Sequence, residues 1–222
     1  MKKEDEISRL KSLYNYELEE YSNGKNLICG LDEAGRGPLA GPVVCAAVIL
    51  PQIKTDADFQ ALQGIDDSKK LSGKKREKLY KDLLDNPKIC IGIGIVSELV
   101  IDKINILRAT QLGMARALRN LDYKPDCLLI DGMLLPKVRI YQRKIIDGDA
   151  LSLSIAAASI VAKVTRDSIM CQYHESYPQY GFNKHKGYGT KEHLKSIKEN
   201  GPCKIHRMTF YPMTLMKEIG YE

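Results

Sequence analysis

The sequence predicts one α/β domain, a mixed β-sheet flanked by helices, with a helical region toward the C-terminus. The chain has 222 residues, of which 44% are hydrophobic, and this is enough for one sizeable core. Its apolar residues fall into short runs typical of buried strands and into stretches with the three- and four-residue spacing of helices. The early strands follow one another, whereas later ones are separated by helices, which favours a mixed sheet.

The first half of the chain predicts a helical extension, three strands and a second helix. Apolar residues recur at helical spacing over 3–21, so we expect residues 1–25 to form an N-terminal helical extension and residues 26–222 the main domain. A basic helix is expected over 71–84, capped by Ser72. The remaining expected segments are strands over 26–32, 42–50 and 88–96, and a loop over 51–68.

The second half predicts alternating helices and strands. A long helix is expected from Ala150 to about Tyr177, ending before Pro178. The other expected segments are a helix over 105–121, strands over 126–130 and 138–146, a loop over 181–190, and a helix from the cap Thr190 to about Asn200. The long helix carries a face of small residues, which predicts tight packing: Ser152, Ser154, Ala156, Ala157, Ala158, Ser159 and Ala162. Gly92 and Gly94 predict a similar close approach on the 88–96 strand.

Composition restricts the class of protein. The formal net charge of +6 permits a polyanionic partner without demanding one. The six cysteines form no CxxC pair, and we expect those in apolar runs to be buried hydrophobes rather than zinc ligands or disulfides. The N-terminus lacks an apolar signal region, and no apolar segment approaches the ~20 residues that span a bilayer. We therefore expect a cytoplasmic protein with no membrane partner.

Three of the apolar segments end in acidic residues. Asp32 and Glu33 end the first, Asp131 ends another, and Asp147 and Asp149 follow a third. Strand ends gather around one crevice in open α/β sheets, so these acids can converge although they are distant in sequence. Converging carboxylates repel one another unless a cation neutralises them. Carboxylate oxygens suit Mg²⁺ or Mn²⁺, and the pattern therefore predicts a divalent metal site.

Each acid also has a purely structural interpretation. Asp131 and Asp147 precede glycines and are typical of turns, and Asp149 could cap the helix that starts at Ala150. Asp32 and Glu33 are harder to explain in this way, because adjacent strand residues point to opposite faces. For both to serve one cation, the chain must bend at the glycines that follow, or one of the two must bind differently.

Basic residues cluster at three places, where they suit phosphate contacts along a duplex. These are Lys69-Lys70, Lys74 to Lys78, and Lys184-His185-Lys186. Each cluster could equally be a solvated face. Lys163, Arg166 and Asp167 follow the small-residue face and either reach the cleft or form a surface ion-paired set. We take Lys69, Lys163 and Lys186 as candidate substrate contacts.

Six ordered motifs resemble those of the bacterial ribonuclease HII family. They are DEAGRGPLAGPV at 32–43, DDSKKLS at 66–72, LLIDG at 128–132, SLSIAAASIVAKVTRD at 152–167, YGFNKHKGYGTKEH at 180–193 and HRMTFYP at 206–212. The resemblance covers the chain from about residue 27 to 212. The related ribonuclease HIII group typically has Gly-Thr-Gly where this chain has Gly35-Arg36-Gly37, and it carries a larger N-terminal domain than residues 1–25.

The resemblance implies a ribonuclease H-like fold and a metal-dependent endoribonuclease. Such an enzyme cuts the RNA strand of RNA–DNA hybrids and nicks duplex DNA on the 5′ side of single embedded ribonucleotides, leaving 3′-hydroxyl and 5′-phosphate ends. Two divalent ions, Mn²⁺ or Mg²⁺, are implied, and we expect a monomer. By motif position the catalytic and metal-binding acids are Asp32, Glu33, Asp131 and Asp149, with Asp147 close to the last of them.

The resemblance also implies how RNA is told from DNA. Gly35, Arg36 and Gly37 match the family element that contacts the 2′-hydroxyl at the RNA–DNA junction. Glycines suit this task because a backbone can reach the 2′-hydroxyl only where no side chain blocks it. Tyr188 matches the tyrosine that stacks on the sugar of the following deoxynucleotide. Two alternatives are a non-catalytic nucleic-acid-binding module and another nuclease of the same fold, such as ribonuclease HIII.

Overall fold

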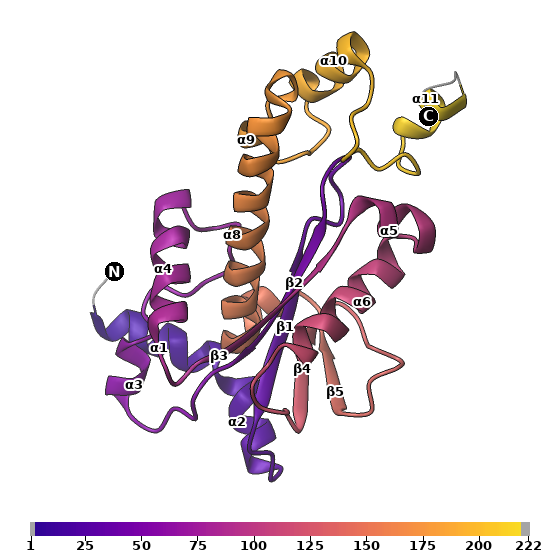
Figure 1. Ribbon diagram of the computed structural model, residues 1–222. Coiled ribbons are helices and arrows are strands. Elements are labelled where there is room, and N and C mark those ends of the chain that lie inside the picture. The colour runs from indigo at the N-terminus through magenta and orange to yellow at the C-terminus, as the bar shows by residue number, and fades with distance from the viewer. Residues whose placement is uncertain (1–2, 219–222) are drawn as a thin grey trace.

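A five-stranded mixed sheet forms the centre of the computed structural model, which describes residues 3–218 (Figure 1). The strands are β1 (Ile28–Ala34), β2 (Val43–Ile49), β3 (Cys90–Val96), β4 (Cys127–Asp131) and β5 (Tyr141–Ile145), in the order β3-β2-β1-β4-β5. β1, β2 and β3 pair antiparallel, whereas β4 runs parallel to both β1 and β5. The predicted mixed sheet is therefore confirmed. Residues 1–2 and 219–222, at the ends of the two predicted segments, lie outside the described residues.

Helices cover both faces of this sheet. The helix α8 (Leu153–Ser176) packs on β1 and β2, with α1 (Lys3–Leu13), α3 (Asp56–Gln60) and α4 (Gly73–Asp85) on the same side. The opposite face is covered by α5 (Glu98–Ile104) and α6 (Ile106–Arg119). The other helices are α2 (Asn15–Ser22), α7 (Gly148–Leu151), η1 (Pro178–Tyr180), α9 (Phe182–His185), α10 (Lys191–Asn200) and α11 (Met213–Glu218).

Several helix boundaries differ from the predicted segments. The predicted N-terminal helix is two helices, and the predicted 51–68 loop contains α3, which a capping box of Thr55 and Asp58 begins. The predicted helix start at Asn105 is confirmed, since this residue adopts a positive φ of 65° and its side chain caps α6, whereas α5 before it was not predicted. Ser152 has an extended backbone and caps α8, which separates it from α7. α9 lies within the predicted 181–190 loop.

The connection from β4 to β5 contains no helix, in agreement with the predicted strands over 126–130 and 138–146, and the two strands are parallel neighbours. The hydrogen bond from the Gly132 nitrogen to the Ile145 carbonyl, 2.9 Å, continues the pairing beyond the end of β4. The predicted caps Ser72 and Thr190 are confirmed, since both side chains accept a hydrogen bond from the first helical turn.

Small residues bring the helices close to the sheet. A Cβ atom on Gly94 would lie 2.0 Å from the Gly113 carbonyl oxygen of α6, and one on Gly30 would lie 2.2 Å from the Ser154 carbonyl carbon of α8. Such contacts are too short for any side chain, so these two strands require glycine there. The tight packing predicted for the small-residue face of α8 is confirmed, since all seven of its residues are buried.

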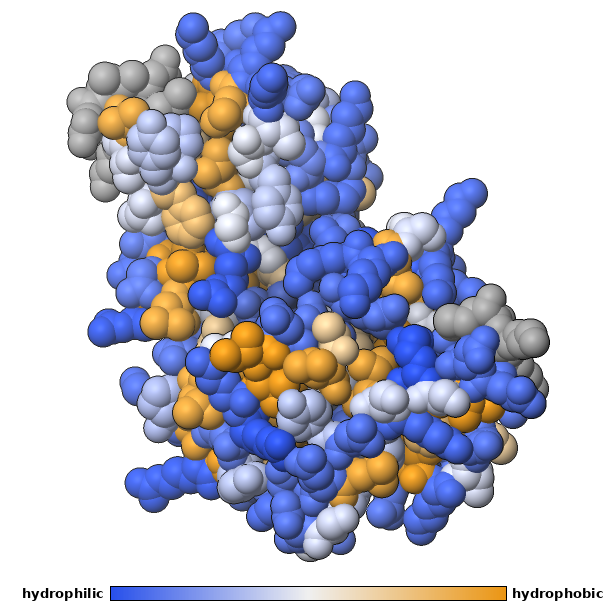
Figure 2. All heavy atoms as spheres, turned by 180° about the vertical axis from the view of Figure 1, so that it is seen from behind, coloured by the Kyte–Doolittle hydropathy of each residue, from blue (hydrophilic) through white to orange (hydrophobic). Residues whose placement is uncertain are grey.

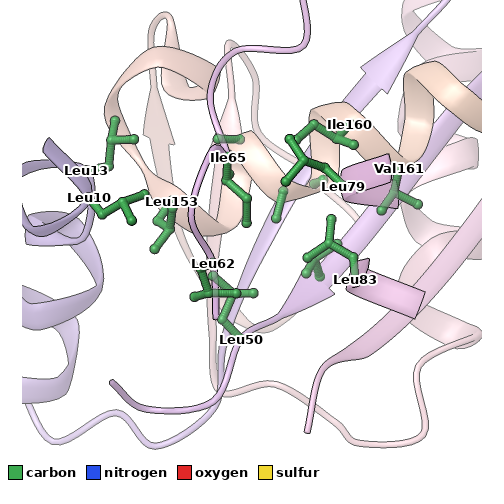
Figure 3. Packing of buried hydrophobic residues seen from close by; sticks show 14 of the residues in the cluster. Leu10, Leu13, Leu50, Leu62, Ile65, Leu79, Leu83, Leu153, Ile160 and Val161 are labelled. Carbon is green, nitrogen blue, oxygen red and sulfur yellow. The ribbon is translucent and has the colours of Figure 1, made fainter. Parts of the chain in front are cut away.

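The two N-terminal helices belong to the main core. Leu10 and Leu13 of α1 lie beside Leu153 of α8, in the same buried cluster as Leu79 of α4 and Ile160 of α8 (Figure 3). Polar contacts reinforce this packing, since the Arg9 guanidinium donates to the Ile65 carbonyl at 2.7 Å and the Glu6 carboxylate accepts from the Gly64 nitrogen at 2.9 Å. α1 thus supports the segment that leads to Lys69.

Glu17 of α2 ties the N-terminal segment to the start of α8. Its Oε1 accepts hydrogen bonds from the Ser152 hydroxyl at 2.7 Å, the Ser154 nitrogen at 2.9 Å and the Ser154 hydroxyl at 2.6 Å. The side chain is buried, and burial raises the pKa of Glu17 above its ordinary value. The carboxyl group therefore satisfies three buried donors at the helix end nearest to Asp149.

Replacing Glu17 with alanine is expected to lower the free energy of unfolding by about 2–4 kcal/mol, because three buried donors lose their acceptor. Urea denaturation of Glu17→Ala measures this effect. Glu19→Ala is the matched control, since Glu19 lies on the same helix, is 57% exposed and pairs with Arg143 at the surface. Its expected loss is below about 1 kcal/mol. Equal losses in the two variants would contradict the proposed support.

The face seen in Figure 2 is mostly hydrophilic, with hydrophobic groups along its upper left side and in its central and lower part. Cys29, Cys45, Cys90 and Cys127 are buried free thiols, as the apolar runs predict. Within residues 3–218, no helix has the combination of length and apolar character needed to cross a membrane.

Candidate active site

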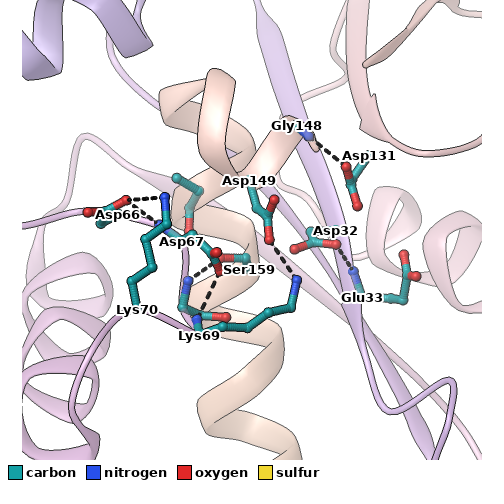
Figure 4. Close-up of polar contacts among 12 residues, drawn as sticks. Asp32, Glu33, Asp66, Asp67, Lys69, Lys70, Asp131, Gly148, Asp149 and Ser159 are labelled. Carbon is teal, nitrogen blue, oxygen red and sulfur yellow. Dashed lines mark hydrogen bonds and ion pairs between the residues drawn. The ribbon is translucent and has the colours of Figure 1, made fainter. Parts of the chain in front are cut away.

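The acids predicted from the strand ends lie together at one end of the sheet (Figure 4). Asp32 and Glu33 are in β1, Asp131 is the last residue of β4, and Asp149 is in the short helix α7. Asp32 and Asp149 are each only 6% exposed. The Asp131 Oδ1 accepts a hydrogen bond from the Gly148 nitrogen at 2.7 Å, which connects the end of β4 to the start of α7.

Asp32 and Glu33 lie at this site on opposite faces of the sheet. Asp32 shares the face of Gly30, which packs on α8, and Glu33 shares the face of Leu31, which packs with α6. Of the two alternatives for this pair, the bend is absent, because β1 continues as a strand to Ala34. The parallel pairing of β1 with β4 ends at Leu31, and beyond it β1 continues paired with β2, beside Asp131. Carboxylates from both faces can therefore meet around the end of β4.

The four carboxylates repel one another electrostatically. Burial, and then the Glu33 and Asp131 carboxylates, raise the pKa of Asp32 well above its ordinary value. Burial also raises the pKa of Glu33, against the opposing effect of the Arg36 guanidinium. Burial raises the pKa of Asp131, with the Gly148 hydrogen bond opposing it and Asp149 adding to it. The site thus concentrates negative charge where water is largely excluded.

Two cations partly balance this charge. The Lys69 ammonium lies 2.9 Å from the Asp149 Oδ2, and the Arg36 guanidinium lies 3.3 Å from the Glu33 Oε1. The hydrogen bond to Asp149 raises the pKa of Lys69. This contact contradicts the interpretation of Asp149 as a helix cap, since Asp149 lies within α7 and its carboxylate turns toward Lys69. Asp147 is exposed and occupies the turn before α7 with a φ of 54°.

The segment before Lys69 has a turn that aims this side chain. The Asp67 carboxylate accepts from the Lys69 nitrogen at 2.9 Å, and the Ser68 nitrogen donates to the Ser159 hydroxyl of α8 at 3.3 Å. The Arg76 guanidinium donates to the Ser68 and Leu71 carbonyls, both at 2.8 Å. Arg76 is therefore a support for this loop rather than a free phosphate contact.

The acid cluster suits a hard divalent cation by its donor chemistry. Four carboxylates supply oxygen ligands, and the Glu33 Oε2 is a buried oxygen without a hydrogen-bond partner. As placed in residues 3–218, no three His, Cys, Asp or Glu side chains form a group that could hold a metal ion. Asp149 faces Lys69 and Glu33 faces Arg36, so a cation would replace these two side-chain charges as their partner.

Two buried arginines hold the backbone of the Gly-Arg-Gly loop from beneath. The Arg207 guanidinium donates to the carbonyls of Gly35 at 2.6 Å, Arg36 at 2.9 Å and Gly41 at 2.8 Å. The Arg166 guanidinium donates to the Pro42 carbonyl at 2.9 Å and to the Ala40 carbonyl at 3.1 Å. Both side chains are 0% exposed, so the surface interpretation of Arg166 is wrong.

Tyr188 stands beside this loop. The Tyr188 side chain is 45% exposed, and its ring lies 5.9 Å from the Arg166 guanidinium. A Cβ atom placed on Gly37 would lie 3.9 Å from the Cε1 atom of this ring. The Leu39 nitrogen donates to the Gly187 carbonyl at 2.9 Å, which joins the two loops directly. The structure therefore brings Gly35, Arg36, Gly37 and Tyr188 to one surface next to Glu33.

The amino-acid pattern of residues 29–213 matches the family model described as Ribonuclease HII. The chain belongs to the ribonuclease HII family. Ribonuclease HII of Acetivibrio thermocellus is 52% identical over 95% of this chain and 79% of its own length. The ribonuclease H2 crystal structure from Pyrococcus horikoshii OT3 is 27% identical, with a TM-score of 0.70 over 87% of this chain and 98% of that one. Bst-RNase HIII in complex with Mn²⁺, at 17% identity and a TM-score of 0.66 over 88% of this chain and 70% of that one, shows the fold alone.

Membership of the ribonuclease HII family confirms the resemblance read from the six motifs. The chain is a metal-dependent endoribonuclease with a ribonuclease H-like fold, in a family that cleaves the RNA strand of RNA–DNA hybrids. The non-catalytic alternative is therefore wrong, and the match is to ribonuclease HII rather than to ribonuclease HIII.

Two candidate substrate contacts are engaged within the ribonuclease HII chain itself. The Lys163 ammonium pairs with the Asp167 carboxylate at 2.8 Å. The Lys186 ammonium donates to the Cys171 sulfur at 3.2 Å and to the Asn183 carbonyl, while its own carbonyl accepts from Arg166. Their roles as phosphate contacts stay predictions.

Sequence reasoning gave no role to Arg207 and left Arg166 undecided. Both lie in motifs that carry the family resemblance, and this is the only sequence signal that marks them. Their partners are backbone carbonyls, which leave no pattern of complementary side chains in the sequence.

Proposed function

We propose that this member of the ribonuclease HII family cleaves the RNA strand of RNA–DNA hybrids and nicks duplex DNA on the 5′ side of single embedded ribonucleotides. The products carry 3′-hydroxyl and 5′-phosphate ends. One observation carries the proposal: the acid cluster at the ends of β1 and β4 adjoins a Gly-Arg-Gly loop whose backbone is bare and held in place. The proposed catalytic acids and the loop proposed to recognise the 2′-hydroxyl are therefore adjacent, and the Glu33–Arg36 ion pair connects them.

Asp32, Glu33, Asp131 and Asp149 are proposed to hold two divalent ions, Mg²⁺ or Mn²⁺. When bound, such ions supply a nucleophilic water and stabilise the leaving 3′-oxygen. Asp32 and Asp149 contribute from the α8 side of the sheet and Glu33 from the α6 side, with Asp131 between them. The Lys69 ammonium beside Asp149 is placed to attract and orient the scissile phosphate.

Recognition of the ribonucleotide is proposed for the loop and Tyr188. Gly35, Arg36 and Gly37 would together contact the 2′-hydroxyl. Gly37 is exposed and leaves its backbone accessible, Gly35 is buried against Arg166 behind it, and Arg36 is exposed for a phosphate. The exposed ring of Tyr188 would stack on the sugar of the following deoxynucleotide. We further propose that the enzyme acts as a cytoplasmic monomer, and that Lys163 and Lys186 lie along the path of the duplex.

A single embedded ribonucleotide in a DNA duplex is the discriminating substrate. With Mn²⁺ or Mg²⁺ we expect one nick on the 5′ side of the ribonucleotide, and the all-DNA duplex of the same sequence should stay intact. Denaturing gels with end-labelled strands measure both the position of the nick and its end groups. Cleavage confined to long hybrids would contradict the proposed recognition and would favour a ribonuclease HIII-like preference.

A further inference from the structure

Three of the four histidines gather behind Tyr188, away from the acid cluster. His193 of α10 and His206 are buried, and their Nε2 atoms lie 3.1 Å apart. The ring of His185 in α9 stacks on that of His193 at a centroid distance of 4.4 Å. Phe182 and Tyr180 pack edge-on to these rings and complete an apolar enclosure. Nothing in the proposed chemistry uses these histidines.

The hydrogen bonds around His206 fix the direction of the contact between the two rings. The Cys203 backbone nitrogen donates to the His206 Nδ1 at 2.8 Å, and an amide nitrogen can only donate. A neutral His206 therefore carries its proton on Nε2 and donates it to the His193 Nε2. The remaining proton of His193 lies on Nδ1, which donates to the Tyr188 carbonyl at 2.9 Å. These three hydrogen bonds run from the Cys203 amide through His206 and His193 to the Tyr188 carbonyl. We name this series of hydrogen bonds the imidazole relay.

The backbone of Tyr188 is held from both sides by this group. Its carbonyl accepts from His193, and its nitrogen donates to the His185 carbonyl at 2.9 Å. The Gly187 nitrogen donates to the His185 Nδ1 at 3.2 Å, so the His185 proton lies on Nε2, which is 2.7 Å from the Tyr180 carbonyl. All three rings are thus satisfied as neutral imidazoles, each with a defined tautomer.

A further proton on either ring would break the relay. On His193 it would set two N–H groups against each other across 3.1 Å, and on His206 it would oppose the Cys203 N–H across 2.8 Å. Burial lowers the pKa of His193 and of His206 to about 4, and burial also lowers the pKa of His185. The titratable groups that face the rings are His185 itself, Glu192 of α10, Lys186, Tyr180 of η1, and Cys203. Within residues 3–218, no carboxylate accepts a hydrogen bond from His193 or His206 that would favour their charged forms.

We propose that His193 and His206 are positioning residues that hold Tyr188 through the imidazole relay, and so set the preference for a single ribonucleotide over a continuous hybrid. This inference rests on the proposed function, because it takes Tyr188 as the group that stacks at the RNA–DNA junction. The relay acts on the backbone of Tyr188 and leaves its ring exposed. Disturbing it should move the ring without touching the acids.

The first test compares two substitutions at His193 on two substrates. His193→Phe keeps the aromatic volume and removes the donor to Tyr188, whereas His193→Asn keeps an N–H near the Nδ1 position. For the single-ribonucleotide duplex we expect His193→Phe to lower kcat/KM about tenfold, mainly by raising KM. For a long hybrid we expect kcat/KM of this variant to stay within about threefold of the wild-type value. His193→Asn should recover most of the loss. An equal loss on both substrates, or no recovery in His193→Asn, would overturn the proposal.

A second measurement does not depend on cleavage. Nitrogen–proton correlation NMR of the imidazole rings should show the Nδ1–H tautomer for His193 and the Nε2–H tautomer for His206, both persisting well below pH 6.5. Imidazolium signals at pH 6 would overturn the relay even in a fully active enzyme. If the proposed function fails and no nick forms at a single ribonucleotide, the NMR result still decides whether the relay exists.

The pH profile links the two measurements. Acid also protonates the carboxylate cluster, but that effect is common to both substrates and cancels in the ratio of their kcat/KM values. As pH falls from 6.5 toward 4 we expect the ratio of single-ribonucleotide to hybrid cleavage to fall in the wild type. It should stay flat in His193→Phe, in which the link to Tyr188 is already lost. A flat ratio in the wild type would overturn the proposal.

Discussion

Replacing Asp32 with asparagine is expected to lower kcat at least about 10³-fold and, in the same variant, to stabilise the metal-free protein. The activity should fall because Asp32 is one of the four acids proposed to hold the divalent ions, and 10³-fold corresponds to only about 4 kcal/mol of transition-state stabilisation. The side chain should stay in place, since an amide oxygen can still accept the hydrogen bond that Asp32 receives from the Glu33 nitrogen at 2.7 Å.

The gain in stability follows from the raised pKa of Asp32. Between the ordinary carboxyl pKa of about 4 and the raised one, the folded state binds more protons than the unfolded state. The free energy of unfolding of the metal-free wild type should therefore fall as pH rises through this window. Asp32→Asn has no such proton to lose, so we expect it to be more stable by about 1–2 kcal/mol at neutral pH and equal to the wild type below about pH 4.

Thermal unfolding with and without Mn²⁺ separates these two effects. The wild type should gain stability from Mn²⁺ because only its folded state binds the ion well, and Asp32→Asn should gain much less. Asp147→Asn is the matched control, since Asp147 is an exposed acid beside the site and asparagine tolerates its positive φ. It should keep most activity and the full response to Mn²⁺. Loss of that response in Asp147→Asn alone would mean that Asp147, and not Asp149, completes the metal site.

The strands and helices that could be predicted are those whose buried residues form a regular apolar pattern in the sequence. All five strands were predicted within a few residues, because each is a short apolar or β-prone run ending in a turn or an acid. The boundaries that were missed depend on single residues, such as the capping box at Thr55 that begins α3 and the extended Ser152 that separates α7 from α8. The parallel direction of β4 and β5 was not predicted, because parallel strands usually need a longer crossover than the connection between these two.

The candidate site, like the fold, could be predicted only in part from the sequence. The acids could be predicted because strand ends meet in space, and the structure brings Asp32, Glu33, Asp131 and Asp149 together. Alternation in β1 correctly predicted that Asp32 and Glu33 diverge. It could not show that β4 ends beside them and leaves room for both. The supports of the loop could not be predicted, because Arg166, Arg207 and His193 act on backbone groups brought together only by folding.

Replacing Arg207 with lysine is expected to disable the Gly-Arg-Gly loop while leaving the acids intact. One guanidinium joins the two ends of the loop, since its Nη2 donates to both the Gly35 and the Gly41 carbonyls and its Nη1 donates to the Arg36 carbonyl. A lysine ammonium is a compact group without this planar fork and cannot reach all three. We expect a loss of about 2–4 kcal/mol in the free energy of unfolding and at least about a 100-fold fall in kcat/KM at a single ribonucleotide.

The expected loss is one of geometry rather than of charge. Burial lowers the pKa of Arg207 to about 9, so it is still charged at neutral pH, and Arg207→Lys conserves a cation next to the loop. Binding of Mn²⁺, measured by calorimetry, should therefore be nearly unchanged while cleavage falls. Arg116→Lys is the matched control, because Arg116 donates to the single Ile95 carbonyl at an exposed site, and we expect a change below about 0.5 kcal/mol there. If Arg207→Lys cleaved the single-ribonucleotide duplex at the wild-type rate, the loop would not depend on this clamp, and the 2′-hydroxyl would have to be recognised by groups that need no fixed backbone.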